Sequence, residues 1–228
     1  MDLSTKYRLV EFLEQFILDA RMQKFRSVLD GRTRHITIVL EDIFQSQNAS
    51  AVLRTCECTG IQDVHIIENE NQFDIHPDIV MGASKWLTLH QYNQQKDNTL
   101  HCLQSLKQQG YRLIATSPLP SGVALEELPV DQKTAILFGN ELNGLSPQAI
   151  ELADGHMHIP MRGFTESFNI SVSAAICLNH LSHAIRREGS SWQLSDEEGA
   201  DLLLDWMQKT LRNPDPLIRH FVEKESVA

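Results

Sequence analysis

Long apolar runs and cysteines are both scarce in this sequence. No stretch of about 18 apolar residues occurs in the 228-residue chain, so we expect no membrane-spanning helix. The N-terminal segment lacks a basic region followed by an uncharged apolar block, so we expect no signal peptide and a cytoplasmic location. The cysteines lack zinc-site spacing and are expected to be reduced thiols at all four positions, Cys56, Cys58, Cys102 and Cys177.

Positive charge is also scarce. The chain carries 30 acidic and 20 basic residues, which gives a net charge of −10 and a pI of about 5.4. A broad electrostatic contact with nucleic acid, which needs many Lys and Arg side chains, is therefore not indicated. Residues 1–40 are an exception, with seven basic against five acidic residues. Any nucleic-acid contact is predicted to use local basic clusters, such as Lys24, Arg26, Arg32 and Arg34.

Two further patterns are missing. No G-x-G-x-x-G sequence follows the first predicted strand, so a dinucleotide-dependent oxidoreductase is a poor interpretation. His156 and His158 alternate in a short predicted strand, but no Cys or acidic residue stands at ligand spacing from them. Cys56 and Cys58 lie two residues apart in a predicted helix, where they do not face each other. We therefore expect no metal site.

Strands and helices alternate along the middle of the chain. Runs rich in β-branched residues predict strands at 35–41, 63–68, 87–92, 111–116, 133–138 and 156–159. Between them, apolar periodicity and capping residues predict helices at 48–60, 98–109, 146–153 and 169–187, with a short helical turn after Pro77. This alternation predicts an α/β fold with a mainly parallel sheet.

Both ends of the chain are predicted to be helical. Apolar spacing over residues 4–29 predicts two helices with a break near residues 19–21. Ser195 followed by acidic residues resembles a capped helix start, and an apolar stripe follows it. We therefore divide the chain into an N-terminal helical arm (1–34), an α/β domain (35–188) and a C-terminal helical extension (189–228).

Three motifs lie at strand ends or helix starts. The first is Asn48 and Arg54, within one predicted helix. The second is FGNELNGL at residues 138–145, and the third is IPMRGFTESFNISVSAA at residues 159–175. In the third, a strand stops at Pro160 and a polar loop leads into a helix of small residues, which suits a ligand with a carboxylate, ribose or adenine edge. Taken alone, each motif also fits an ordinary helix surface or turn.

The ends of three predicted strands are expected to form one ligand-binding edge. Parallel strands meet at their carboxyl ends, where open α/β sheets bind ligands, so Thr116, Gly139 and Ile159 should gather there. Gly139 would let a ligand approach the backbone because glycine has no Cβ, and Gly144 would permit a tight return of the loop. The alternative role for Thr116 is a hydroxyl that caps a strand end.

In this order and at these separations, the three motifs resemble those of the SPOUT superfamily, specifically the TrmH-like (SpoU) RNA ribose 2′-O-methyltransferases. The resemblance covers residues 35–187, and the helical ends resemble those of the tRNA guanosine 2′-O-methyltransferase subgroup. It implies an α/β fold whose C-terminal part is threaded as a trefoil knot. It also implies a homodimer with the active site at the interface and S-adenosylmethionine, the methyl donor, held in the knot.

The resemblance also implies the residues of a methyl-donor pocket. The residues that match the family's donor-binding positions are Thr116, Gly139, Gly144, Ile159, Met161 and Phe168. The family usually has leucine where this chain has Phe168, whose ring would narrow the pocket or stack differently. Arg162 is a candidate phosphate contact or an ordinary surface arginine.

By the same resemblance, Arg54 is the main catalytic residue. An arginine guanidinium stays protonated, so aligning the ribose hydroxyl and binding an RNA phosphate suit it better than abstracting a proton. Asn48, Glu141, Ser167 and Asn169 complete the implied site. The alternative roles are a surface salt bridge for Arg54, helix capping for Asn48, Ser167 and Asn169, and a solvated loop position for Glu141.

The sequence therefore predicts S-adenosylmethionine-dependent 2′-O-methylation of ribose in structured RNA. The D-loop guanosine-18 of tRNA is the first candidate, because both helical extensions are present. Ribosomal RNA is an alternative substrate, and a non-catalytic RNA-binding or assembly factor that keeps the knot is an alternative function. We also predict that Arg54 approaches Gly139 and Ser167 at a subunit boundary.

Overall fold

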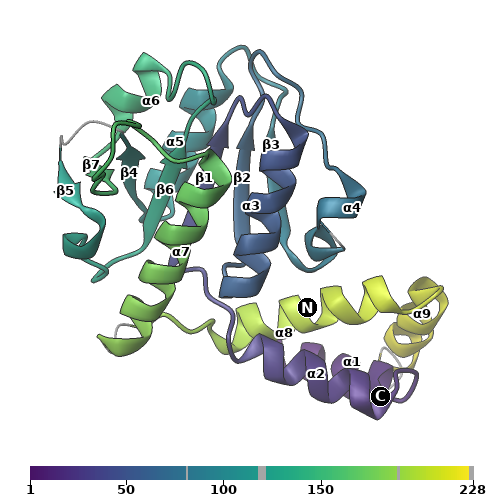
Figure 1. The fold of residues 1–228 in the computed structure, drawn as a ribbon. Coiled ribbons are helices and arrows are strands. Elements are labelled where there is room, and N and C mark those ends of the chain that lie inside the picture. Colours follow the sequence, from purple (N-terminus) through teal and green to yellow (C-terminus); the bar gives the residue numbers. More distant parts are fainter. Residues whose placement is uncertain (81, 118–121, 189–190, 226–228) are drawn as a thin grey trace. The chain divides into compact units, whose positions relative to one another are not determined.

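A parallel sheet organises the larger part of the chain in the computed structural model, which describes residues 1–80, 82–117, 122–188 and 191–225 (Figure 1). The strands within these residues are β1 (Ile36–Glu41), β2 (Asp63–Ile67), β3 (Thr88–Tyr92), β4 (Arg112–Thr116), β5 (Val123–Ala124), β6 (Thr134–Phe138) and β7 (Gly155–His158). Their order across the sheet is β3-β2-β1-β6-β4-β7-β5, and every neighbouring pair is parallel. The prediction of a mainly parallel α/β sheet is confirmed.

Helices cover both faces of this sheet, as Figure 1 shows. On one face, α3 (Ser46–Thr59) and α7 (Ile170–Arg187) pack on alternate residues of β1 such as Ile38. On the other, α5 (Asn98–Gln108) and α6 (Pro147–Leu152) pack on the residues between, such as Val39. Strands covered on both faces have little contact with water, which explains the continuous burial of β1, β2 and β6.

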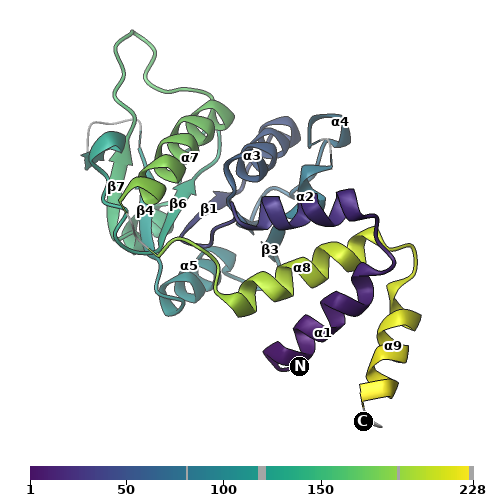
Figure 2. The same cartoon turned by 90° about the horizontal axis from the view of Figure 1, so that it is seen from below.

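The loop between β7 and α7 extends away from the sheet, whereas α3 and α7 lie side by side (Figure 2). Residues 162–169 of this loop are exposed. The remaining short elements are α4 (Pro77–Val80), which was predicted, and the 3-10 turns η1 (Ala83–Trp86) and η2 (Leu125–Glu127). The sequence did not predict β5, because two residues are too few to show a period.

Helix boundaries follow the capping residues. Ser146 caps α6, since its Oγ accepts a hydrogen bond of 3.1 Å from the Ala149 N–H, and Pro147 is the first helical residue. Asn169 caps α7 through a 2.9 Å bond from the Ser171 N–H. Gly60 ends α3 with a φ of +83°, a conformation that glycine adopts at little cost. These starts and stops were predicted from the sequence.

The two ends of the chain, Met1–Arg32 and Gln193–Ala228, form a second unit, while Thr33–Trp192 forms the sheet unit. The helices of the second unit are α1 (Leu3–Glu14), α2 (Asp19–Leu29), α8 (Asp196–Thr210) and α9 (Pro214–Glu225). Trp206 of α8 is buried against Phe25 of α2, with ring centroids 5.8 Å apart. Ser195 and Glu198 form the predicted capping box of α8. The three-part division drawn from the sequence stays a prediction.

Two predictions about this helical unit need correction. The break between its first helices covers residues 15–18 rather than 19–21, because Asp19 already begins α2. The apolar pattern hides this break, since Ile17 is buried within the connection itself. The predicted basic cluster is also wrong for Arg32, which is buried with its guanidinium 5.4 Å from the Trp206 ring centroid. For Lys24, Arg26 and Arg34 it stays a prediction.

No helix among the described residues has the length and apolar character needed to cross a membrane.

Candidate functional site

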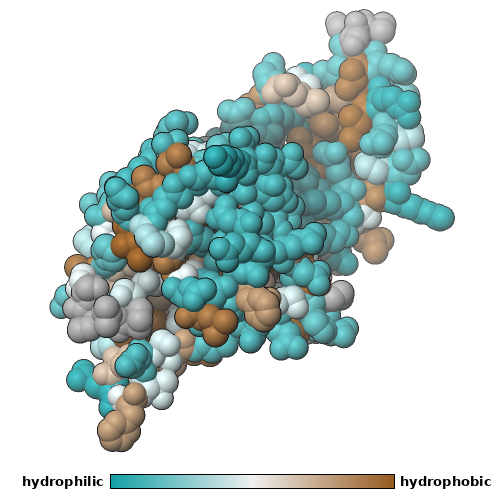
Figure 3. Space-filling view, turned by 90° about the horizontal axis from the view of Figure 1, so that it is seen from above, coloured by the Kyte–Doolittle hydropathy of each residue, from teal (hydrophilic) through white to brown (hydrophobic). Residues whose placement is uncertain are grey.

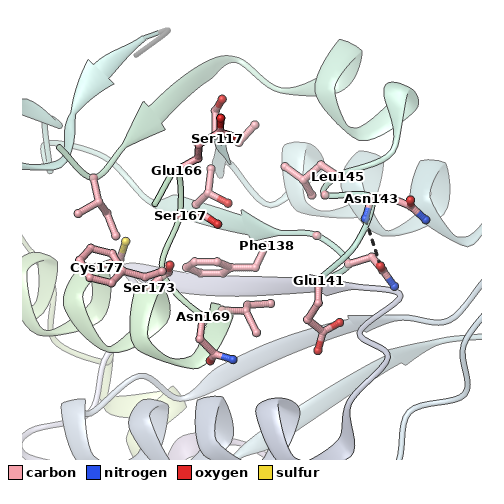
Figure 4. Close-up of a pocket in the computed structure, with 18 of the residues that line it drawn as sticks. Ser117, Phe138, Glu141, Asn143, Leu145, Glu166, Ser167, Asn169, Ser173 and Cys177 are labelled. Atoms are coloured by element: carbon pink, nitrogen blue, oxygen red, sulfur yellow. Dashed lines mark hydrogen bonds between the residues drawn. The ribbon is translucent and has the colours of Figure 1, made fainter. Parts of the chain in front are cut away.

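A cavity of about 770 Å³ lies at the carboxyl ends of β4, β6 and β7 (Figure 4). Its wall includes strand-end residues such as Thr116 and Phe138, the loop Gly139–Leu145 that follows β6, and the segment that leads into α7. A cavity of this size suits a drug-sized or cofactor-sized molecule. The strand ends therefore gather as the parallel topology predicts.

Most of the predicted site residues line this cavity. The six predicted ligand-pocket residues all do so: Thr116, Gly139, Gly144, Ile159, Met161 and Phe168. Four of the five predicted catalytic residues also line it: Asn48, Glu141, Ser167 and Asn169. The structure thus brings parts of all three motifs to one place, and the roles of these residues toward a ligand stay predictions.

Arg54 is absent from the described wall of the cavity. It lies on α3, six residues after Asn48, and an α-helix turns by about 100° per residue, so the two side chains point in different directions. The side chain of Arg54 is exposed, whereas Asn48 belongs to the buried face of α3. Arg162 is also exposed and outside the wall. One copy of the chain does not bring Arg54 into its own cavity.

A chain of hydrogen bonds joins the three motifs. The Asn48 amide nitrogen donates to the Glu141 carboxylate over 2.8 Å. The Asn48 amide oxygen accepts a bond of 3.1 Å from the Asn169 side chain. Asn48 is 7% exposed, so its amide is held in one orientation by partners on both sides. The helix-capping role of Asn169 and its place in the site therefore hold together.

Glu141 is fixed from several directions. Its carboxylate also accepts bonds from the backbone N–H groups of Phe44, at 3.0 Å, and Gln45, at 3.2 Å. Burial alone would raise the pKa of Glu141, but the hydrogen bonds from Asn48 and from these backbone groups outweigh it and hold the pKa below its ordinary value. Glu141 is therefore an ionised anchor between two loops rather than the solvated side chain of the alternative interpretation.

The loop Gly139–Leu145 is a tight turn closed by Asn140 and Gly144. The Asn140 N–H donates to the Gly144 carbonyl over 2.9 Å, and the reverse bond is 2.8 Å. Gly144 has a φ of +70°, as its predicted role in the return of the loop requires. A Cβ on Gly139 would lie 2.1 Å from the Gly144 carbonyl carbon. The missing Cβ of Gly139 thus makes room for the loop itself, and the approach of a ligand to this backbone stays a prediction.

Thr116 has the alternative role of a strand-end hydroxyl, and its role toward a ligand stays a prediction. Its hydroxyl donates to the Leu137 carbonyl on β6 over 2.7 Å, which ties the ends of two strands together. The residue also lines the cavity.

Several cavity residues were not predicted. They are Gln45, Ser117, Asn140, His156, Glu166, Ser173 and Cys177, among others. Ser173 and Cys177 follow Asn169 at steps of four residues, so the helical period could have placed them on the same face of α7. Burial raises the pKa of Cys177 to about 12. Its thiol is therefore neutral near pH 7 and is not a nucleophile.

The surface around the cavity carries exposed apolar side chains. Phe44 is 65% exposed, Leu142 is 85% exposed and Phe164 is fully exposed. Figure 3 shows apolar side chains as separate patches on a mostly hydrophilic face. No group of three or more metal-ligating side chains occurs among the described residues.

Comparisons with known proteins identify similar sequences and structures. The model of the SpoU rRNA Methylase family matches residues 35–179. A tRNA (guanosine(18)-2′-O)-methyltransferase of Borreliella burgdorferi is 41% identical over 201 residues, which cover 88% of this chain and 90% of that protein. The crystal structure of an Aquifex aeolicus TrmH/SpoU tRNA modifying enzyme superposes with a TM-score of 0.75 at 28% identity, over 85% of this chain and 98% of that one.

A more distant likeness is the SpoU methyltransferase AviRb from Streptomyces viridochromogenes, solved in complex with the cofactor AdoMet. It superposes with a TM-score of 0.59 at 19% identity, over 72% of this chain and 62% of that one. At this sequence identity, the similarity shows that the two proteins share a fold.

Proposed function

The chain belongs to the SpoU rRNA methylase family, and on that premise we propose that it transfers a methyl group to the ribose 2′-hydroxyl of guanosine-18 in tRNA. The main structural support for this proposal is the Glu141–Asn48–Asn169 hydrogen-bond chain, which joins all three motifs beside one cavity. The 41% identity to a tRNA (guanosine(18)-2′-O)-methyltransferase, over most of both chains, supports this choice of substrate. A tRNA substrate also agrees with the cytoplasmic location expected from the sequence.

S-adenosylmethionine is the proposed methyl donor, and it supplies a methyl group on a sulfonium sulfur when bound. The cavity has a suitable volume, about 770 Å³. Ile159 and Met161 line the cavity and offer apolar contacts. In the proposed fold the segment after β7 is threaded through the chain as a trefoil knot, as in the family. No metal takes part in this proposal.

A homodimer is the second part of the proposal, with Arg54 of the partner subunit completing the cavity. Two observations support it. Arg54 is exposed and lies outside the cavity of its own chain. Exposed apolar side chains, including Leu142 at 85%, stand beside the cavity, where they would be covered by a second copy.

In this arrangement the residues of the chain bind and orient rather than form a covalent bond. Arg54 aligns the ribose hydroxyl and binds a neighbouring RNA phosphate, because its planar guanidinium matches phosphate oxygens and does not give up a proton. Glu141 and Asn48 hold the loops that define where the donor and the ribose meet. Correct alignment of the two reacting groups then contributes much of the rate acceleration.

The test is methyl transfer to unmodified tRNA by wild type and by Arg54→Ala. We expect the substitution to lower kcat/KM by about 100-fold or more, because it removes alignment and a phosphate contact. Arg187→Ala, which removes another exposed arginine from the same unit, is the matched control and should retain activity. Equal activity of Arg54→Ala and wild type would contradict the proposed chemistry.

Ribosomal RNA is a second candidate substrate, because the matching family model is described as an rRNA methylase. A tRNA transcript with adenosine at position 18 separates the two. Loss of methylation on that transcript supports guanosine-18, whereas methylation of ribosomal RNA alone supports the second candidate. Calorimetry that detects no S-adenosylmethionine binding at millimolar donor would favour a non-catalytic RNA-binding factor.

A further inference from the structure

Two consecutive carboxylates, Glu41 and Asp42, stand at the end of β1 and are not among the residues that line the cavity. Asp42 has a φ of +51°, and among the described residues other than glycine it alone has a positive φ. Residues that have a side chain seldom adopt this left-handed backbone conformation, although Asp and Asn do so more readily than most. Such a conformation persists when surrounding contacts hold it, and it often occurs at functional sites.

The carboxylate of Asp42 supplies those contacts. Its Oδ1 accepts hydrogen bonds from three consecutive backbone N–H groups, at 2.7 Å from Asn69, 2.8 Å from Glu70 and 3.2 Å from Asn71. Hydrogen bonds from neutral donors to a carboxylate are stronger than those to a neutral acceptor. The loop after β2 therefore fixes the side chain of Asp42, and with it the unusual backbone conformation.

This conformation presents the Asp42 carbonyl to the cavity loop. The carbonyl oxygen accepts a bond of 2.8 Å from the side-chain nitrogen of Asn140. The side-chain oxygen of Asn140 accepts bonds from the N–H groups of Leu142, at 2.9 Å, and Asn143, at 3.3 Å. One asparagine side chain thus connects Asp42 to the interior of the turn that forms part of the cavity wall.

Glu41 holds the other end of the same loop. It is 2% exposed, and its Oε1 accepts bonds from the hydroxyls of Thr99, at 2.6 Å, and Ser146, at 2.7 Å. Its Oε2 accepts a bond of 2.8 Å from the Ser146 N–H. Ser146 directly follows the loop and caps α6. Glu41 and Asp42 therefore contact the chain at the two ends of the loop Gly139–Leu145.

We propose that Glu41 and Asp42 are positioning residues that set the shape of the loop Gly139–Leu145 and so tune methyl-donor binding. They act through Ser146 and Asn140 and do not touch the donor. The part of this inference that concerns the donor rests on the proposed function, whereas the part that concerns the loop does not. The loop after β2 also takes part, because it holds Asp42, although it is distant in sequence from the loop Gly139–Leu145.

Asp42→Ala tests the proposal, with Asp42→Asn as the conservative variant. Alanine removes the acceptor for three backbone N–H groups, whereas asparagine keeps one oxygen and tolerates the left-handed conformation. Asp154→Ala is the matched control, because the Asp154 carboxylate also accepts a backbone N–H, from Leu113 over 2.8 Å, outside the cavity wall.

Two measurements are made on the full-length protein, well below the melting temperature. Hydrogen exchange follows the amides of Leu142, Asn143 and Gly144, and calorimetry gives the Kd for S-adenosylmethionine. We expect Asp42→Ala to speed exchange of these amides and to raise the donor Kd by about tenfold, because a small displacement of binding groups has a large effect. Asp42→Asn should stay within about threefold of wild type, and Asp154→Ala should change neither quantity.

The readouts separate a positioning role from a purely structural one. A lower melting temperature for Asp42→Ala with unchanged loop exchange and unchanged donor Kd would overturn the proposal. Failure of wild type to bind the donor would instead contradict the proposed function, and the exchange of the loop amides would still decide whether Asp42 holds the loop. Glu41→Gln, which weakens the bonds to Ser146, provides a second variant with the same expected direction.

Discussion

At the scale of single residues, the side chain of Asn48 links two loops of the cavity wall. Its amide is the link between Glu141 and Asn169, so one buried group holds two loops that are more than 20 residues apart in sequence. Asn48 itself is only 7% exposed, so its amide has little access to water as an alternative partner. The residue therefore couples folding of the loops to the geometry of the cavity.

Asn48→Ala is expected to lower the free energy of unfolding by about 1–3 kcal/mol, since it removes two hydrogen bonds, one to Glu141 and one from Asn169, that each contribute about 0.5–1.5 kcal/mol. Urea unfolding measures the change. Asn93→Ala is the matched control, because its amide also donates to a carboxylate, that of Glu68 over 2.7 Å, but at an exposed site. A loss for Asn48→Ala no larger than that of the control would contradict this account.

Glu141 gives a prediction about pH. Its pKa lies below the ordinary value of 4.5 in the folded protein, so the unfolded chain binds more protons between the two values. The stability that the ionised carboxylate contributes is therefore fully present above about pH 5 and is lost as pH falls through the folded pKa. The difference in unfolding free energy between wild type and Glu141→Gln should be constant from pH 6 to pH 7 and shrink below about pH 4.5. If this difference in unfolding free energy grew as the pH fell, the lowered pKa of Glu141 in the folded protein would be disproved.

The sequence could predict those site residues that have a local signal in the chain, and it could not predict those that depend on contacts between distant loops. Glu141, Asn169 and Thr116 stand beside strand ends or helix starts, and these places are visible in the sequence. Asn140 and Asp42 were not singled out, because their contacts join loops from separate parts of the chain. Such contacts depend on tertiary structure, and no local pattern signals them.

At the scale of elements, the short turn after β6 is tightly constrained. Asn140 and Gly144 exchange two backbone hydrogen bonds, and Gly139 has no space for a side chain. Ordinary turns tolerate many residues at their ends, but here two backbone segments touch at the mouth of a cavity. The turn therefore forms only with glycine at the start.

Gly139→Ala is expected to abolish donor binding or lower the melting temperature strongly, because its Cβ would lie 2.1 Å from a Gly144 backbone atom. Calorimetric binding and thermal unfolding measure the two effects. Gly199→Ala serves as the control, since the nearest atom to its Cβ would be 3.9 Å away and it lies inside α8. There alanine should stabilise the helix by up to about 1 kcal/mol. A tolerated Gly139→Ala would show that the turn can open.

The elements that the sequence predicted best are those with local signals. Capping residues at Ser146, Asn169 and Ser195 mark three helix starts within a residue. The break after α1 was misplaced, because the connection buries Ile17 as a helix would. The strand β5 was missed, because it depends on its pairing with β7 and not on its own pattern.

At the scale of the whole molecule, catalytic activity depends on the proposed dimer. Arg54 lies outside the cavity of its own chain, while Asn48, Glu141 and Asn169 line it. If each active site takes Arg54 from one subunit and the cavity from the other, two inactive variants can complement each other.

Mixing Arg54→Ala with Asn169→Ala after reversible dissociation tests this arrangement. Half of the dimers would be mixed, and each would contain one intact site, so about a quarter of wild-type activity should return. Each variant mixed with itself is the control and should stay inactive. No recovery in mixed dimers, confirmed as such by two different affinity tags, would place Arg54 and the cavity in the same subunit or outside the reaction.

The pairing of the two chain ends in one helical unit has a consequence for synthesis on the ribosome. The first helices, α1 and α2, emerge before any strand, yet α8, on which their apolar residues such as Leu13 and Phe25 pack, is translated only after the complete sheet unit. Those side chains remain without their native cover until α8 has been synthesised. Nascent chains that stall before α8 therefore expose the apolar side chains of α1 and α2, to which chaperones can bind, and the helical unit can form only after α8 has left the ribosome.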